Sequence, residues 1–120
     1  MIYLSGRMVS NNEIGVMLGF NANNFTYQNF IDTKKDKDYF WAMDNGCFSQ
    51  PDKYSDAAFI DHLKSVNDTS ALFAVAPDVL EDHIATKQKS LPMLKRIRDL
   101  GYKAAYVIQD GETVNSVCWD

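Results

Sequence analysis

Three polar side chains able to bind a ligand or take part in catalysis each come directly after an apolar run of the chain. They are Asp44 after residues 39–43, Asp78 after residues 71–76 and Pro77, and Gln109 after residues 104–108. Such runs are typical of strands that are buried on both faces. Parallel strands end at the same edge of a sheet, where ligands bind in α/β proteins, so the pattern predicts one shared site.

The elements that must position these residues alternate between strand and helix. We expect strands at residues 1–4, 39–43, 71–76 and 104–108, and helices at residues 55–66 and 81–100. Residues 7–38 are rich in turn-forming Asn, so the apolar run 16–18 is interpreted as part of an irregular segment, with one short helix around residues 25–32. The alternation predicts an α/β fold with a parallel sheet.

Both expected helices carry apolar residues at helical spacing. In the first, Ser55 is the N-cap, and His62 beside the apolar stripe is interpreted as a packed or surface side chain. In the second, the inward residues are Ile84, Leu91, Leu94, Ile97 and Leu100, followed by Gly101 as the C-cap. Pro92 either kinks this helix or opens another one. Its lysines and arginines form a solvated face, with phosphate binding as the alternative.

The strand ends resemble motifs of the tRNA-guanine transglycosylase superfamily. Residues 44–49, Asp-Asn-Gly-Cys-Phe-Ser, are similar to the Asp-Ser-Gly-Gly-Phe-Gln motif of those enzymes, and residues 107–111, Val-Ile-Gln-Asp-Gly, to their Val-Gln-Gly-Gly strand end. With Ala-Pro-Asp-Val-Leu-Glu-Asp-His at residues 76–83, the pattern most resembles phage and bacterial relatives that insert 7-deazaguanine bases into DNA. The resemblance runs from about residue 2 to residue 111, but only these segments are specific.

The resemblance implies a role for each matching residue. Asp44 is the catalytic aspartate beside the sugar, as general base or in positioning, and Asp78 reads the base. Gln109 hydrogen-bonds the base carbonyl, and Gly111 lets the backbone approach the base. Breaking an N-glycosidic bond creates an oxocarbenium-like centre that a carboxylate stabilises. The two oxygens of a second carboxylate match the N1–H and exocyclic amine of guanine.

Other residues near the strand ends have supporting roles. Asn45 and Gly46 position the loop that aims Asp44, and Phe48 is a base-stacking candidate. His83 is a candidate for phosphate contact or proton transfer, its alternative being a place in the first helical turn. Trp41, within its apolar run, is interpreted as core.

The chain also departs from the family pattern. Asn45, Cys47 and Ser49 replace a serine, a glycine and a glutamine of the tRNA enzymes, and Asp110 replaces a glycine, which favours DNA over tRNA as the substrate. The covalent nucleophile and the cysteine-rich zinc site of the family have no counterpart before residue 120. The resemblance therefore implies no metal or cofactor within this chain, and zinc only in a C-terminal half.

Two architectures fit the expected elements. A complete TIM (β/α)₈ barrel takes about 250 residues, so four strands in 120 residues correspond to its N-terminal half, a single partial domain truncated at the C-terminus. The alternative is a self-contained α/β sandwich with a flavodoxin-like sheet, which needs five strands. Because only four are expected, the half barrel is favoured.

Composition limits the partners and the compartment. The net charge of −4 gives no general basic surface, so contact with nucleic acid requires a local patch. Cys47 and Cys118 lack the spacing of a metal or disulfide pair, and no basic segment with a long apolar stretch opens the chain. We expect a cytoplasmic protein without a membrane span, with DNA and a 7-deazaguanine base as partners. A homodimer is left open.

Each acid also has a plain structural interpretation. Asp44 before Asn-Gly can form a turn, Asp78 or Asp82 can cap the next helix, and Asp110 with Gly111 can make a turn. Three functions are therefore carried forward. The first is base exchange, the second is a glycosidic-bond hydrolase that uses Asp44 and Asp78 as paired acid and base, and the third is a non-catalytic interaction protein.

Overall fold

The computed structural model describes residues 3–5, 14–18 and 40–117 of the chain. They form a sheet of five strands in the order β1-β2-β3-β4-β5, and every neighbouring pair is parallel. The strands are β1 (Tyr3–Ser5), β2 (Ile14–Leu18), β3 (Trp41–Met43), β4 (Ala74–Val75) and β5 (Ala104–Ala105). The predicted α/β fold with a parallel sheet is confirmed.

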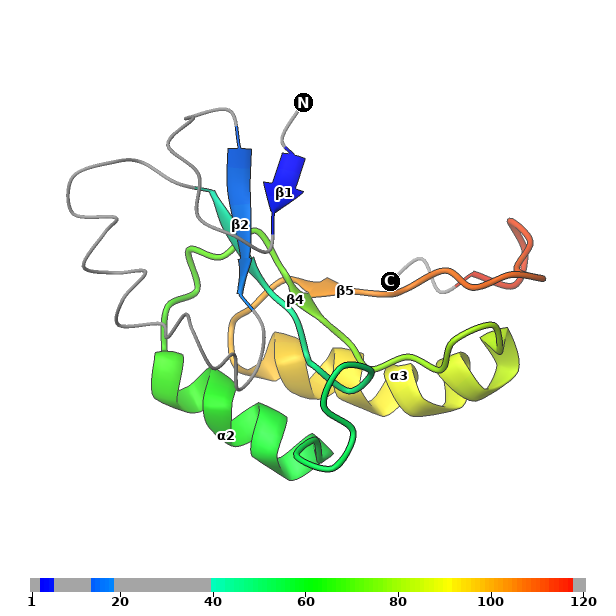
Figure 1. Cartoon of the computed structure of the whole chain (residues 1–120), viewed down its shortest axis with the longest axis horizontal. Coiled ribbons are helices and arrows are strands. Elements are labelled where there is room, and N and C mark those ends of the chain that lie inside the picture. The colour runs from blue at the N-terminus through cyan, green and yellow to red at the C-terminus, as the bar shows by residue number, and fades with distance from the viewer. Residues whose placement is uncertain (1–2, 6–13, 19–39, 118–120) are drawn as a thin grey trace.

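Two helices connect the last three strands. Helix α2 (Asp56–Val66) lies between β3 and β4, and α3 (His83–Asp99) lies between β4 and β5. Both lie on the same side of the sheet (Figure 1). Neither described helix is long and apolar enough to cross a membrane.

The strand count differs from the prediction. Residues 14–18 form β2, whereas the sequence around the run 16–18 predicts an irregular segment. The Asn-rich surroundings predicted turns, whereas pairing with β1 on one edge and β3 on the other supplies this segment with backbone partners. The other strands are shorter than expected, and the helix predicted around residues 25–32 lies outside the described residues.

The strand order distinguishes the two predicted architectures. A flavodoxin-like sheet has the order 2-1-3-4-5, which places helices on both faces. The order here is sequential, and the two described crossovers, through α2 and α3, fall on the same face of the sheet. Five strands are therefore present without the flavodoxin-like arrangement, and the described residues form an open sheet rather than a closed barrel.

The core lies between the sheet and the two helices. Trp41 and Met43 of β3 are each 1 % exposed and belong to this core, as predicted for Trp41. The helices contribute apolar side chains from their inner faces, namely Phe59, Ile60, Leu63 and Val66 from α2 and Met93, Leu94 and Ile97 from α3. Ser55 caps α2 as predicted, with its hydroxyl accepting the Ala58 N–H at 3.0 Å. His62 is half-buried, and burial lowers its pKa.

The inward face of α3 differs from the predicted stripe. Ile84 and Leu91 are 62 % and 44 % exposed, whereas Thr86 and Ser90 are fully buried. Thr86 and Ser90 can be buried in this helix because their hydroxyls form hydrogen bonds with backbone groups of the loop between β4 and α3. The helix also runs through Pro92 without a second helix opening there, and Gly101 follows its Leu100 C-cap with φ of 91°.

Candidate functional site

Asn45 ties the end of β3 to the end of β4. Its side chain is 2 % exposed, and its amide nitrogen donates to the carbonyl oxygens of Val75 at 3.2 Å and Ala76 at 3.1 Å. Its amide oxygen accepts the backbone N–H of Cys47 at 2.7 Å. Gly46 between them has φ of 68°, a conformation that glycine adopts without strain. One buried side chain thus fixes the loop after β3.

Asp44 is half-buried at the start of this loop. Its Oδ1 accepts the backbone N–H of Asn45 at 2.8 Å. Within the described residues no hydrogen bond joins Asp44 to Asp78 or Gln109, and its Oδ2 has no hydrogen-bond partner there. The turn itself lies at residues 47–49, closed by the bond from the Gln50 N–H to the Gly46 carbonyl at 2.9 Å, so Asp44 precedes the turn. One of its carboxylate oxygens is left for another contact.

The loop that carries Asp78 is anchored on both sides to α3. The Ser90 hydroxyl donates to the Pro77 carbonyl at 2.6 Å, and the Thr86 hydroxyl exchanges two hydrogen bonds with the backbone of Val79, at 2.8 and 2.9 Å. These bonds, made by two buried side chains, hold the residues before and after Asp78. The sequence does not predict these bonds, because Thr86 and Ser90 are polar residues that fall between the apolar positions of the helix.

Asp78 and Gln109 lie in direct contact across the ends of β4 and β5. The Gln109 Nε2 donates to Asp78 Oδ2 at 2.8 Å, while the Gln109 Oε1 accepts the backbone N–H of Glu81 at 3.0 Å. Because the Glu81 N–H can only donate, it determines which end of the amide is oxygen and turns the NH₂ group toward Asp78. The two residues that the resemblance assigns to base reading are therefore neighbours.

Cys47 contacts the other oxygen of Asp78. Its Sγ lies 3.7 Å from Asp78 Oδ1 and 3.7 Å from the Asp78 carbonyl oxygen. Burial raises the pKa of the Cys47 thiol, so it remains a hydrogen-bond donor at neutral pH. Cys47 thus joins β3 to the Asp78–Gln109 pair. The sequence singled it out only as a departure from the family motif.

His83 and Gly111 lie against each other beyond Gln109. Asp82 caps α3 by accepting the Ala85 N–H at 2.9 Å, so His83 occupies the first helical turn, its plain interpretation. Gly111 has φ of 89°, and a Cβ on it would lie 3.0 Å from Cδ2 of the His83 ring. The missing side chain is thus required by this packing as well as by the backbone conformation.

Replacing Gly111 by alanine is expected to destabilise the chain by about 1–2 kcal/mol, because both the positive φ and the His83 ring oppose a Cβ. Urea unfolding measures this change. Adding His83→Ala removes the ring but not the backbone strain, so the double variant should recover part of the loss. If Gly111→Ala unfolds at the same urea concentration as the wild type, the packing described here is wrong.

The remaining candidates lie at the rim of the site. Phe48 is 67 % exposed in the loop after β3, and Asp110 is exposed in the turn after Gln109. No group of three or more His, Cys, Asp or Glu side chains that could hold a metal ion occurs in residues 3–5, 14–18 and 40–117.

Comparisons with known proteins add no relative. No protein-family model matches the chain, and no curated protein or solved structure matches it. A function for this chain can therefore be proposed only from its own residues and from the motif resemblance described above.

Proposed function

We propose that this chain is the N-terminal half of a TIM (β/α)₈-barrel enzyme that exchanges guanine for a 7-deazaguanine base in DNA, with tRNA as the less favoured substrate. The observation that carries this proposal is the 2.8 Å hydrogen bond between Gln109 Nε2 and Asp78 Oδ2. It holds a carboxylate and a primary amide side by side at adjacent strand ends. The site would thus bind one edge of a planar base.

The hydrogen-bonding groups of this pair complement guanine. The edge of guanine carries an acceptor, O6, beside two donors, N1–H and the exocyclic amine. The Asp78 carboxylate has lone pairs for the two donors, and the second N–H of the Gln109 amide can donate to O6. The Glu81 N–H fixes the orientation of that amide. Adenine, which reverses this pattern, would meet a mismatched donor and acceptor.

Asp44 would act on the sugar side of the base. When the bond between C1′ and the base nitrogen breaks, positive charge develops on the sugar, and a carboxylate beside it stabilises that charge. The Oδ1 of Asp44 is held by the Asn45 N–H, which fixes the group and leaves Oδ2 for the substrate. Asn45 in turn fixes the loop of Asp44 relative to β4.

The strand order supports the barrel architecture. A (β/α)₈ barrel has neighbouring parallel strands in sequence order with all helices outside. The described chain has that order, with α2 and α3 on one face. The candidate residues lie at the carboxyl ends of β3, β4 and β5, the edge at which barrel enzymes carry their active sites.

The test is incorporation of labelled 7-deazaguanine into duplex DNA by the protein expressed from its complete reading frame. Label retained in the DNA, with release of an equal amount of guanine, is the expected result. Release of free guanine without incorporation would replace this proposal with the hydrolase. Neither incorporation nor release, from a folded protein, would favour a non-catalytic interaction protein.

Asp44→Ala should lower the rate of exchange by at least about 10³-fold, because the carboxylate that stabilises the developing charge is lost. Its folding should change little, since Asp44 follows β3 and does not belong to the core. Asp61→Ala, which removes an exposed carboxylate of α2, is the matched control and should leave exchange unchanged. Exchange by Asp44→Ala at the wild-type rate would rule out this assignment.

A further inference from the structure

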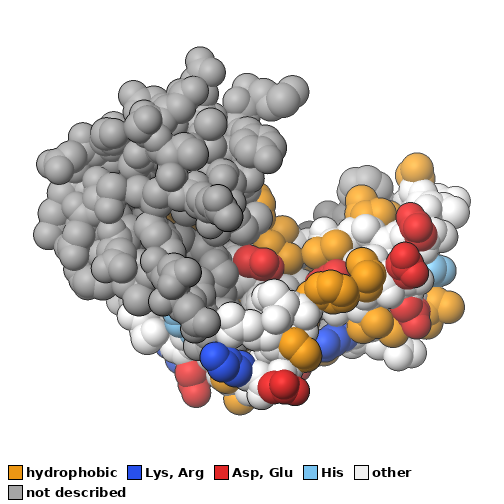
Figure 2. Space-filling view, viewed as in Figure 1, with side chains coloured by type: hydrophobic (Ala, Val, Ile, Leu, Met, Phe, Trp, Pro, Cys, Tyr) orange, Lys and Arg blue, Asp and Glu red, His pale blue; other side chains and the backbone are white. Residues whose placement is uncertain are grey.

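Exposed apolar side chains are concentrated in the segments around α3, next to the strand-end site. Of the seven large apolar side chains exposed among the described residues, five belong to the loop before α3, to the first half of α3, or to the segment after β5. They are Leu80, Ile84, Leu91, Ile108 and Val114. In Figure 2, hydrophobic and acidic side chains lie side by side at one end of the molecule. Such a cluster marks an interaction surface.

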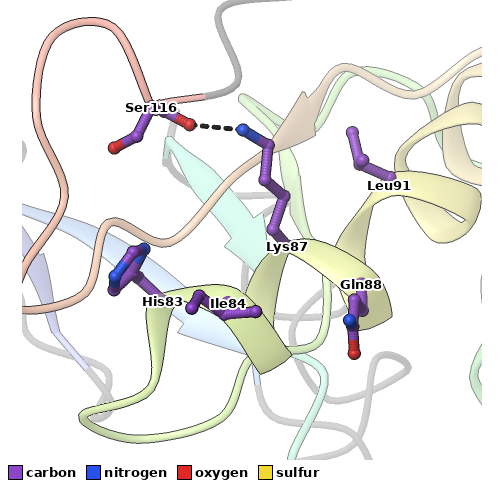
Figure 3. A pocket seen from close by; sticks show the side chains of 6 residues that line it. All are labelled: His83, Ile84, Lys87, Gln88, Leu91 and Ser116. Atoms are coloured by element: carbon purple, nitrogen blue, oxygen red, sulfur yellow. Dashed lines mark hydrogen bonds between the residues drawn. The ribbon is translucent and has the colours of Figure 1, made fainter.

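A pocket of about 390 Å³ lies within this surface, between α3 and the segment that follows β5. Its lining residues are His83, Ile84, Lys87, Gln88, Leu91 and Ser116 (Figure 3). The Lys87 ammonium donates to the Ser116 carbonyl oxygen at 2.6 Å, which ties the segment to the helix. Ile84 and Leu91 form the apolar wall on α3. We call this feature the α3 groove.

The α3 groove is bordered by carboxylates. Glu81 and Asp82 precede α3, and Asp110 and Glu112 lie in the segment on the other side. Together with Lys87, these residues carry four negative charges and one positive charge, a formal total of −3 within a chain whose net charge is −4.

We propose that the α3 groove binds a basic amphipathic helix of another protein. Ile84 and Leu91 are seven residues apart, about two helical turns or roughly 10 Å along α3. This spacing matches apolar anchors at positions i and i+7 of a partner helix lying along the groove. Lysine or arginine on the flanks of that helix would face the bordering carboxylates.

A second copy of the chain does not fit this groove. Two chains of net charge −4 repel each other, and each would bring the same carboxylates to the contact. The basic stretch at the end of α3, residues 95–98, cannot serve as the partner helix, because Leu94 and Ile97 beside it are 1 % and 0 % exposed in its own core. The end of α3 therefore does not supply the partner helix, and the proposal commits to a helix of a different protein.

The test uses a fluorescent sixteen-residue peptide of leucine and lysine, with leucines at i, i+3, i+4 and i+7, titrated with the full chain in about 0.15 M salt. Saturable binding with a Kd on the order of 10 μM is expected. Ile84→Ser should weaken it at least fivefold, and Glu81→Gln about twofold. Both side chains are exposed, so neither change should unfold the chain. Phe40→Ser, at an exposed apolar residue elsewhere, is the matched control and should bind normally.

Three results would overturn the proposal. The first is equal binding of a peptide whose leucines are replaced by serine, which would mean that charge alone is recognised. The second is unchanged binding by Ile84→Ser. The third is a concentration-dependent dimer that Ile84→Ser dissociates, which would assign the α3 groove to a second copy. None of these measurements involves a base or DNA, so they are independent of the proposed exchange activity.

Discussion

Asp78→Asn should weaken the binding of free guanine by about 100-fold. In the proposed function the Asp78 carboxylate accepts two donors of the base, and hydrogen bonds to a charged group contribute about 1.5–3 kcal/mol each. An asparagine retains one acceptor oxygen and directs an NH₂ group at a donor of the base, so one bond is lost and a repulsive contact replaces it. A loss of about 2.7 kcal/mol corresponds to this factor.

Calorimetric titration with guanine and 7-deazaguanine measures this effect. The two bases should respond alike, because they share the edge that Asp78 is proposed to read. Asp110→Asn makes the same chemical change at an exposed position one residue beyond Gln109 and should bind as the wild type does. A Kd for Asp78→Asn within threefold of the wild type, from a variant with an unchanged unfolding curve, would show that Asp78 does not read the base.

Asn45→Asp is expected to lower the free energy of unfolding at pH 7 by about 3 kcal/mol or more. The amide nitrogen of Asn45 donates to two carbonyl oxygens, and a carboxylate oxygen in its place would face them with no proton to share. Leaving such groups buried without hydrogen bonds costs about 1–3 kcal/mol, and a buried charge costs more. The loop that carries Asp44 should also become more mobile, because Asn45 no longer ties it to the end of β4.

The sign of the pH dependence follows from this burial. Desolvation and the two carbonyl oxygens raise the folded-state pKa of the introduced carboxyl above its unfolded value of about 3.9. The folded state then binds more protons, so the stability of Asn45→Asp relative to the wild type should fall as pH rises from about 4 through that raised pKa. Urea unfolding at pH 4 and pH 7 measures it. Asn115→Asp, at an exposed turn, should show no such difference.

The sequence predicted the elements with strong local signals. Ser55 before an acidic first turn, and Asp82 before a helical run, specify N-caps through their own side-chain oxygens, so both helix starts could be expected from neighbouring residues. Strand exits marked by Asp44, Asp78 and Gln109 likewise followed from apolar runs that end in polar residues. That Asp78 and Gln109 touch was a consequence of parallel pairing between β4 and β5.

Other features depended on contacts between distant residues. Helical spacing alone predicts that Ile84 and Leu91 face the core, but both are exposed. Thr86 and Ser90 are buried instead, because their hydroxyls form hydrogen bonds with the loop around Asp78. Strand β2 owes its backbone partners to strands on both sides, which a local window does not contain. The contact of Cys47 with Asp78 joins residues 31 positions apart and has no local signal.

Sequential strand order also bears on how the chain folds during synthesis. Met43 of β3 pairs with Ala74 of β4, and Ala74 pairs with Ala104 of β5, so each new pairing closes a segment of about 30 residues. The entropic cost of closing a loop grows only slowly with its length, so the two closures cost about the same. Strands β4 and β5 can therefore each join the sheet once they have followed their own connecting helix, α2 or α3, out of the ribosome, without waiting for a distant part of the chain.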